Sequence, residues 1–553
     1  MRNSVQSSGA TSTLLHRAGQ TDCSPGLIRA SLLLLLLAVS SGCPSGDDSP
    51  PAPTTAPPPA AAANDPLFSD QWHLQNTGQN GATAGEDVRV APVWAGGRKG
   101  EEILIAVVDD GLELAHEDLA PNIAAGMSFN YQTSGTDPTP TAPADNHGTA
   151  VAGVAAARDL NNLGGAGSAP RASLAGYNLI AAGGNTTTNE ADAMARNAAS
   201  VHLSNNSWGP ADDGQLHPAA TAWKTAINTG LTTGRGARGT IYTWAAGNGG
   251  SSAPVDNSNY DGRANHRGVL AICAVGDDGK KASYSEEGAN LWVCAPSLGR
   301  GNHGITTTDR TGAAGYNTAQ PLCGTDSSNT NYTNCFNGTS ASAPLAAGVI
   351  ALILQAKPNL TWRDARLILA ETARKNDPGD AEWKEDGGAD TTGAQYHFNH
   401  KYGFGVTDAQ RAVARALTWT NVAPGKTPFT TALASPALLI PDNNPTGVSH
   451  TITVNGSGIA SIEFIEIAFT TVHTYDGDLQ ITLTHDTTGA QSRLAENRIC
   501  AGGAPCGDYT NWVFGSARHL GEAADGNWTL TVKDLAAVDL GTFQSWQLTF
   551  YGR

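Results

Sequence analysis

The chain has 553 residues, of which 50 are acidic and 33 basic, giving a formal net charge of −17; at about 150 residues per domain it accommodates three or four units, or fewer large ones. This balance excludes non-specific nucleic-acid binding and favours cations or basic substrates as partners. Charged residues make up only 15% of the chain and glycine is abundant, with 64 residues, which is typical of a loop-rich globular protein and not of a disordered one.

An export segment precedes the first folded part. Residues 29–43 read RASLLLLLLAVSSGC: a basic residue, a short apolar run and small residues, too short to span a membrane as a helix. We interpret residues 1–42 as a signal peptide and the Pro/Ala-rich residues 43–64 as a tether. The segment resembles a bacterial lipoprotein signal with Cys43 as the lipidated residue. The alternative is a plain secretory signal with a chance cysteine.

Six cysteines follow the export segment. They fall as three pairs close in sequence, which predicts three local disulfides formed in an oxidising compartment. The predicted pairs are Cys273 with Cys294, Cys323 with Cys335, and Cys500 with Cys506.

Residues 65–420 alternate short apolar runs with helical patterns and Gly/Asn/Asp loops, and the runs include EILIAVVDD and GTIYTWAAGN. This alternation predicts a parallel α/β sheet. The stretch SASAPLAAGVIALILQAKP predicts a buried helix with Pro344 in its first turn and Pro358 after its end. In the helix that follows, Thr361 can cap the amino end and Asp364 can reciprocate.

In residues 421–553 the apolar pattern changes to period two. Apolar residues alternate with polar ones in three runs, which predicts an antiparallel β-sandwich. The runs are Leu479, Ile481 and Leu483; Trp528, Leu530 and Val532; and Trp546, Leu548 and Phe550.

Four residues of the first domain have the chemistry for peptide hydrolysis. Asp109 ends a buried strand, His147 opens a helix and Ser340 lies at another helix start. Hydrolysis needs an activated hydroxyl, an imidazole that takes and returns its proton, and a carboxylate that fixes the imidazole tautomer. Asn248, in WAAGNGG, can donate an amide proton to the tetrahedral oxyanion. Taken singly, each has an ordinary explanation, because most Asp residues are surface charges, most His residues are not catalytic and GTS is a common loop.

Together these four segments resemble the subtilisin-like serine protease superfamily, in which Asp, His, Asn and Ser occur in this order. The phrases NDPLFSDQWHLQNTG, SWGPADDG, NYDG and YDGDLQITLTHD resemble its kexin and furin branch, including the P domain (Homo B domain). The resemblance implies a parallel-sheet α/β catalytic domain followed by a jelly-roll-like all-β P domain. It also implies an exported serine endopeptidase that cleaves protein or peptide substrates after Arg or Lys.

The resemblance assigns the specificity acids residue by residue. Asp212 and Asp261 match the acids that line the pocket for the basic side chain before the cut, and Asp110 and Asp145 match acids that favour a second basic residue. The segment GYNLIAAGGNTTTNEADAM lacks a further acid of that second pocket, so single-basic and paired-basic cleavage both stay open. The alternative for Asp212 and Asp261 is that they bind calcium or are surface carboxylates.

The resemblance also implies calcium, which prefers six to eight oxygen ligands. One site would use Asp65, Asp118 and the loop RDLNNLGGAG, with Asn161 or Asn162 as the side-chain ligand. A second would lie behind the specificity pocket. Its ligands would be Asp212, Asp256 and Glu286. The alternative is that these carboxylates are solvated and bind no metal.

Relatives of this kind carry an amino-terminal propeptide that assists folding, and residues 43–64 are too few for one. We therefore expect that a separate chaperone or the P domain assists folding. We expect the protein at the bacterial outer membrane or cell surface, held through the lipid anchor, or secreted. A broad trypsin-like degradative protease and a non-catalytic surface protein that binds through its P domain are the alternative functions.

Overall fold

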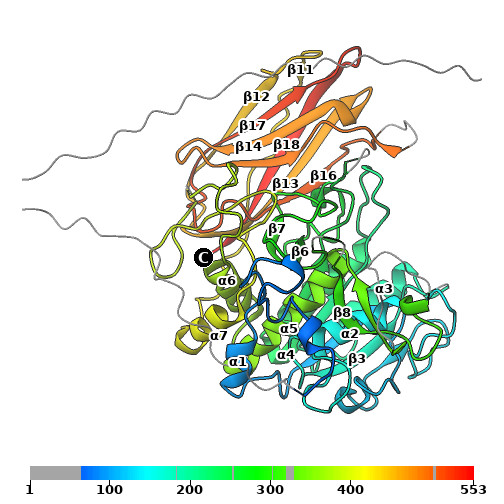
Figure 1. Ribbon diagram of the computed structural model, residues 1–553. Helices are drawn as coiled ribbons and strands as arrows, with labels where there is room; N and C mark the ends of the chain where they lie inside the picture. Colours follow the sequence, from blue (N-terminus) through cyan, green and yellow to red (C-terminus); the bar gives the residue numbers. More distant parts are fainter. Residues whose placement is uncertain are drawn as a thin grey trace, which may run out of the picture. The chain divides into compact units, whose positions relative to one another are not determined.

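The computed structural model describes residues 64–181, 183–251, 255–299, 301, 303–318, 329–385, 387–501 and 506–553. Two different architectures follow one another along this part of the chain, an α/β part and then an all-β part (Figure 1). The predicted signal peptide, the tether residues up to 63 and Cys43 lie outside the described residues.

The first part contains a seven-stranded parallel sheet, as the sequence predicts. Its strands, in spatial order, are β2 (Phe129–Asn130), β3 (Ser173–Asn178), β1 (Leu104–Asp109), β4 (Leu203–Asn206), β5 (Ile241–Ala245), β6 (Val269–Val275) and β7 (Leu291–Pro296). A separate antiparallel pair is formed by β8 (Ile305–Thr308) and β9 (Tyr332–Phe336).

Helices cover both faces of the parallel sheet. They are α1 (Ala91–Ala95), α2 (His147–Ala156), α3 (Thr187–Ala195), α4 (Thr221–Ala237), α5 (Thr339–Ala356), α6 (Trp362–Thr372) and α7 (Ala409–Thr418). Strand β1 shows why the sheet needs a layer of helices on each face. Ile105 and Val107 belong to the core under α2 and α5, whereas Ala106 and Val108 belong to the core under α3 and α4. Burial on both faces explains the unbroken apolar run of this strand.

Helix α5 lies in the core, and 83% of its most apolar window is buried, although its length and composition would also suit a membrane span. Pro344 is its sixth residue, in the second turn and not in the first turn as expected, because the helix already begins at Thr339. A proline there cannot donate to the carbonyl four residues earlier. That carbonyl belongs to Ser340, and it accepts a hydrogen bond from Ser207 Oγ at 3.0 Å.

The next helix begins as predicted. Thr361 and Asp364 form a reciprocal capping box at the start of α6. Asp364 also accepts hydrogen bonds from the Trp419 indole and the Val422 amide, so it joins α6 to the segment that leads into the all-β part.

The all-β part is an antiparallel sandwich. One sheet has the order β10 (Phe429–Thr430), β18 (Gly541–Gly552), β13 (Ile462–His473) and β16 (Trp512–Ser516), with β11 (Leu438–Ile440) also paired to β18. The other has the order β12 (Val448–Val454), β17 (Gly526–Asp534), β14 (Leu479–His485) and β15 (Gln491–Ala495). The three apolar runs with period two lie on β14, β17 and β18, and their apolar side chains are all buried between the sheets.

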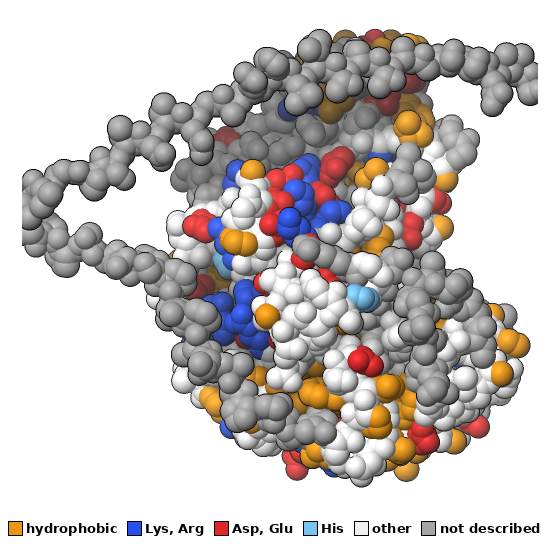
Figure 2. Space-filling view, viewed as in Figure 1, with side chains coloured by type: hydrophobic (Ala, Val, Ile, Leu, Met, Phe, Trp, Pro, Cys, Tyr) orange, Lys and Arg blue, Asp and Glu red, His pale blue; other side chains and the backbone are white. Residues whose placement is uncertain are grey.

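Figure 2 shows a mixed group of acidic and basic side chains on this face and a separate, mainly basic group to its left, and most of the remaining surface there is uncharged. Ion pairs also join the two parts of the chain. Arg493, on β15, contacts Glu287 at 2.6 Å and Glu382 at 3.5 Å, and Arg363 on α6 contacts Glu463 on β13 at 2.5 Å.

Candidate active site

The ends of parallel strands bring the predicted catalytic residues to one edge of the sheet. Asp109 is the last residue of β1, His147 the first of α2, and Asn248 follows β5 by three residues. Loops at the carboxyl ends of parallel strands meet at the same edge. His147, Asn248 and Ser340 line one cavity of about 430 Å³ there.

Asp109 and His147 are in direct contact. Asp109 Oδ1 lies 2.9 Å from His147 Nδ1, and the carboxylate is completely buried. This contact fixes the proton on Nδ1 and leaves Nε2 as the basic nitrogen. Only glycine fits next to the histidine, because a Cβ at Gly148 would lie 2.0 Å from the Gly111 carbonyl oxygen and 2.8 Å from Asp109 Cβ.

Two carboxylates set the charge of the imidazole. Burial alone would lower the pKa of His147, but Asp109 and Asp110 outweigh burial and raise it above 6.5. Burial, together with the charge of Asp109, raises the pKa of Asp110 to about 7. The protonated imidazole is therefore stabilised, as a general base in amide hydrolysis requires.

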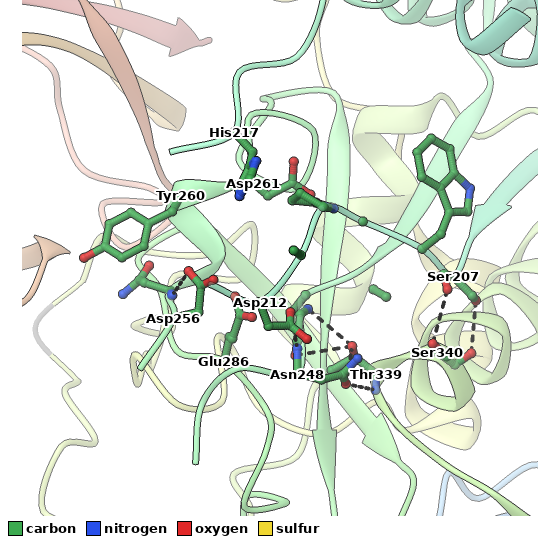
Figure 3. A pocket seen from close by; sticks show the side chains of 18 of the residues that line it. Ser207, Asp212, His217, Asn248, Asp256, Tyr260, Asp261, Glu286, Thr339 and Ser340 are labelled. Carbon is green, nitrogen blue, oxygen red and sulfur yellow. Dashed lines mark hydrogen bonds between the residues drawn. The ribbon is translucent and has the colours of Figure 1, made fainter. Parts of the chain in front are cut away.

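Ser340 lies at the amino end of α5, where backbone N–H groups favour negative charge. Its Oγ donates to the Ser207 carbonyl oxygen at 3.2 Å, and Ser207 Oγ donates to the Ser340 carbonyl oxygen. Figure 3 shows this reciprocal pair at one end of the pocket.

Thr339 orients the Asn248 amide. Asn248 Oδ1 accepts hydrogen bonds from the Thr339 backbone N–H at 2.8 Å and from its hydroxyl at 3.0 Å. A backbone N–H requires an acceptor, so the amide oxygen must face Thr339 and the NH₂ group stays available as a donor. Gly338 allows this approach. Its φ is 78°, and a Cβ at this position would lie 3.3 Å from Asn248 Oδ1, which is a tight contact.

A second, smaller pocket of about 80 Å³ lies beside Ser340, and acidic residues line it (Figure 3). These residues are Asp212, Asp256, Asp261 and Glu286. Burial raises the pKa of Asp261. Arg263 donates its backbone N–H to Asp261 Oδ1 at 2.9 Å, but its guanidinium is paired with Glu190 and lies 3.9 Å from Asp261.

Asp110 and Asp145 do not line this acidic pocket. Asp110 accepts the backbone N–H groups of His147 and Gly148, at 3.0 and 2.7 Å, so both carboxylate oxygens cap the start of α2. Asp145 is half-buried two residues before His147, and the Arg310 guanidinium binds its backbone carbonyl oxygen at 3.4 Å.

Three of the acids form a group of like charges. Oxygen atoms of Asp212, Asp256 and Glu286 all lie within 4.8 Å of one another. Burial and mutual repulsion raise the pKa of Glu286 well above its usual value and that of Asp256 to about 6. Hard carboxylate oxygens at this spacing are the ligand type that calcium prefers, and a divalent cation would relieve the repulsion.

Comparison with known proteins identifies the family to which the chain belongs. The model of the subtilase family matches residues 100–405, and that of the proprotein convertase P-domain matches residues 462–550. The chain belongs to the subtilase family.

Relatives of this subtilase include mouse neuroendocrine convertase 2, 32% identical over 501 residues that cover 88% of this chain and 74% of the relative. A PC3-like endoprotease (variant B) from Hydra vulgaris is 34% identical over 481 residues, covering 85% and 63%. The chain thus spans about three fifths of the Hydra protein. The crystal structure of a serine protease from Aeromonas sobria matches with a TM-score of 0.79 and 27% identity, covering 89% of this chain and 96% of that one. That protease is also known in complex with a chaperone, ORF2.

The other acids of the subtilase that were predicted to bind calcium lie around one loop. Asp65 accepts backbone N–H groups of Leu160, Asn161 and Asn162, at 2.8 to 3.2 Å. Asp118 Oδ1 accepts from the Asn161 amide at 2.7 Å, whereas its Oδ2 is buried and unpaired. Burial is the main reason that the pKa of Asp118 rises to about 7. A buried carboxylate oxygen in need of a partner fits a cation here.

Two of the predicted cysteine pairs are disulfide-bonded in the subtilase. Cys273 on β6 is joined to Cys294 on β7, and Cys500 is joined to Cys506. Cys323, the predicted partner of Cys335, lies outside the described residues.

Two residues of the site were not predicted from the sequence. Thr339, which orients Asn248, is part of the phrase NGTSASAP, and its position beside Ser340 was the only signal. Ser207 lies in NNSWGP, 133 positions before Ser340 in the chain, and only the fold shows that each hydroxyl donates to the backbone carbonyl oxygen of the other residue.

Proposed function

We propose that this subtilase is a serine endopeptidase that cleaves peptide bonds after Arg or Lys. The observation that carries the proposal is the group of acids in the pocket beside Ser340. A guanidinium or ammonium group is the natural partner for a group of carboxylates, of which Asp256 and Glu286 are buried, Asp261 is half-buried and Asp212 is exposed. The contact between Asp109 and His147 argues against the alternative of a non-catalytic surface protein.

The proposed mechanism keeps the observed contact between Asp109 and His147 and requires Ser340 to leave its contact with Ser207. Ser340 Oγ turns from the Ser207 carbonyl toward His147 Nε2, loses its proton to that nitrogen and attacks the scissile carbonyl carbon. Asp109 holds the proton on Nδ1 and stabilises the imidazolium. His147 then protonates the leaving amine, and the acyl-enzyme is hydrolysed by water in the reverse sequence of proton transfers.

Asn248 stabilises the tetrahedral intermediate. Its NH₂ group, held outward by Thr339, donates to the developing oxyanion, and removal of such a donor costs about 3 kcal/mol. Because the donor is fixed before the reaction, no reorganisation is needed when the charge forms.

Asp212 and Asp261 are the proposed acids for the basic side chain before the cut. For a second basic residue, the proposed acids are Asp110 and Asp145. Because both oxygens of Asp110 already accept backbone N–H groups, we favour cleavage after a single basic residue, as in a broad trypsin-like protease, over a strict paired-basic requirement.

We further propose two calcium sites of structural importance. One would be held by Asp212, Asp256 and Glu286, and the other by Asp65, Asp118 and Asn162. The cation at the first site would offset most of the charge of the three carboxylates and fix the loop that carries Asp212. The site residues themselves carry out the proton transfers.

We propose that the catalytic domain spans residues 65–420 and the P domain residues 421–553, and that the protein is exported and anchored through a lipid on Cys43. We also propose that a separate chaperone assists folding, which the Aeromonas complex with ORF2 supports. Refolding of residues 65–553 to full specific activity without a partner would exclude the chaperone. Metabolic labelling with a fatty acid that persists in Cys43→Ser would exclude the anchor.

The deciding experiment is hydrolysis of a peptide panel that varies the two residues before the cut, with Ser340→Ala as the control. Cleavage that requires Arg or Lys and disappears in Ser340→Ala supports the proposal. Equal rates on single and paired basic peptides favour the broad protease. Cleavage that ignores basic residues contradicts the proposed roles of Asp212 and Asp261.

A further inference from the structure

A short segment of the P domain lies against the loop that carries Asp212. Arg498, which follows β15, is 4% exposed. Its Nε donates to the Gly214 carbonyl oxygen at 2.6 Å, and its Nη1 donates to the Tyr509 hydroxyl at 2.9 Å. The Ala501 backbone N–H donates to the Asp213 carbonyl oxygen at 3.0 Å. The backbone at residues 213–214 is therefore held by the P domain.

The backbone at residues 212–214 also holds two of the pocket carboxylates, those of Asp212 and Asp256. The Gly214 N–H donates to Asp256 Oδ2 at 3.0 Å, and Asp212, two residues earlier, accepts the Asn248 N–H at 3.2 Å. A displacement of Gly214 would therefore move Asp212 and break the hydrogen bond to Asp256.

Arg498 contacts the second acidic loop as well. Its guanidinium lies over the Tyr260 ring, 4.0 Å from the ring centroid. Tyr260 lines the pocket and directly precedes Asp261. The Tyr260 hydroxyl also accepts the Glu496 N–H at 3.0 Å.

Strand β16 of the P domain fixes this second loop from another direction. Asn259 donates its amide to the Gly515 carbonyl oxygen at 3.0 Å and accepts the Gly515 N–H at 2.7 Å. Both loops that carry specificity acids are therefore bound to the P domain, and Arg498 contacts both.

We propose that Arg498 is a positioning residue for the specificity pocket, which makes the P domain part of the apparatus that recognises the basic side chain. The inference rests on the proposed function. Arg498 touches neither the substrate nor the reacting atoms; it acts through the Gly214 peptide, which orients Asp212 and Asp256, and through Tyr260, which precedes Asp261.

The test compares the full chain with Arg498→Met, Arg498→Lys and Arg363→Met. Arg363 is the matched control, because it also forms a partly buried contact across the junction of the two domains, with Glu463, and among the described residues it forms no hydrogen bond or ion pair with either acidic loop. For a peptide with Arg before the cut we expect Arg498→Met to raise KM about tenfold or more, since hydrogen bonds from a charged donor are lost, with kcat changed less than about twofold.

A lysine keeps the charge but not the planar set of donors, so we expect Arg498→Lys to have an intermediate KM. Arg363→Met is expected to lower Tm and leave KM unchanged. The proposal is overturned if Arg363→Met and Arg498→Met raise KM equally, or if Arg498→Met lowers Tm alone. If Arg498→Met does not fold, Arg498→Lys decides, and an unchanged KM overturns the proposal.

A second readout does not depend on proteolysis. Calcium is titrated in a thermal melt of each variant in the Ser340→Ala background. We expect Arg498→Met to need several-fold more calcium for half-maximal stabilisation, and Arg363→Met to match the parent. If the parent cleaves no basic peptide, the proposed function has failed, and an unchanged calcium midpoint in Arg498→Met then overturns the role of Arg498 separately.

Discussion

Asp109 and Asp110 are adjacent in the chain, but they act on His147 through different atoms. Asp109 contacts the imidazole, whereas Asp110 binds the backbone N–H groups of His147 and Gly148. Asp110 therefore holds the start of α2 in place and adds negative charge near the ring. The two acids at the end of β1 therefore have different roles: Asp109 contacts the imidazole and Asp110 holds the helix.

We expect the pH dependence of activity to reflect the negative charge of Asp110 near His147. A general base must be neutral in the free enzyme, and the pKa of His147 is raised above 6.5, so we expect kcat/KM to fall as the pH drops through a midpoint above 6.5. Asp110→Asn removes a negative charge and should move this acid limb to lower pH. Asp137→Asn, which changes an exposed acid, should leave the limb in place. An unshifted limb in Asp110→Asn would contradict the assignment.

Substitutions at two acids of the pocket should affect substrate binding and calcium binding separately. Asp261 is outside the group of three close carboxylates, so Asp261→Asn should raise KM for Arg and Lys peptides and lower kcat/KM by roughly thirtyfold, or about 2 kcal/mol, with no change in the calcium midpoint. Glu286→Gln should mainly weaken calcium binding, measured by thermal melts. Identical effects of both changes on both quantities would show that the pocket and the metal site are not separable.

At the scale of elements, helix α2 packs so closely on the end of β1 that its second residue has no space for a side chain. A methyl group at Gly148 would clash with the Gly111 carbonyl oxygen and with Asp109. The helix would have to move away from the strand, and the contact between His147 and Asp109 would lengthen. The geometry of the catalytic pair is thus determined by helix-to-strand packing.

Gly148→Ala should therefore lower kcat/KM about a hundredfold or more, since a displacement of about 1 Å in a catalytic group has that effect, and it should also lower Tm. Gly379→Ala is the control, because a methyl group there would meet no atom within 4 Å. Peptide hydrolysis and thermal melts measure both effects. Full activity in Gly148→Ala would mean that α2 does not hold His147 as described.

For the whole molecule, the sequence was sufficient to predict the parallel sheet, the β-sandwich and the capping box of α6, because each depends on a local period or spacing. A family resemblance also pointed to Asp212 and Asp261, which line the pocket beside Ser340, and their role in substrate binding stays a prediction. The sequence could not predict that Ser207 pairs with Ser340, or that Arg498 reaches Gly214. Those contacts join residues 133 and 284 positions apart. The first depends on how the loops of the α/β part meet and the second on how the two domains pack, and no local pattern encodes either.

Calcium should affect the stability of the whole molecule, because the proposed sites join segments far apart in the chain. Asp212, Asp256 and Glu286 repel one another without a cation, and calcium at one hundred times its Kd would stabilise the folded state by about 2.7 kcal/mol per site. We expect excess EGTA to lower Tm and abolish cleavage, and calcium to restore both.

Magnesium should restore much less, because it requires a tighter octahedral shell and gives up its water reluctantly. The Ser340→Ala variant, which has no activity and cannot digest itself, should show the same loss of Tm in EGTA. That control distinguishes a loss of folding stability from autolysis of a loosened enzyme. Unchanged Tm and activity in excess EGTA would exclude both calcium sites, and the carboxylate group would then have to be stabilised by protonation, with activity that declines as the pH rises and the acids ionise.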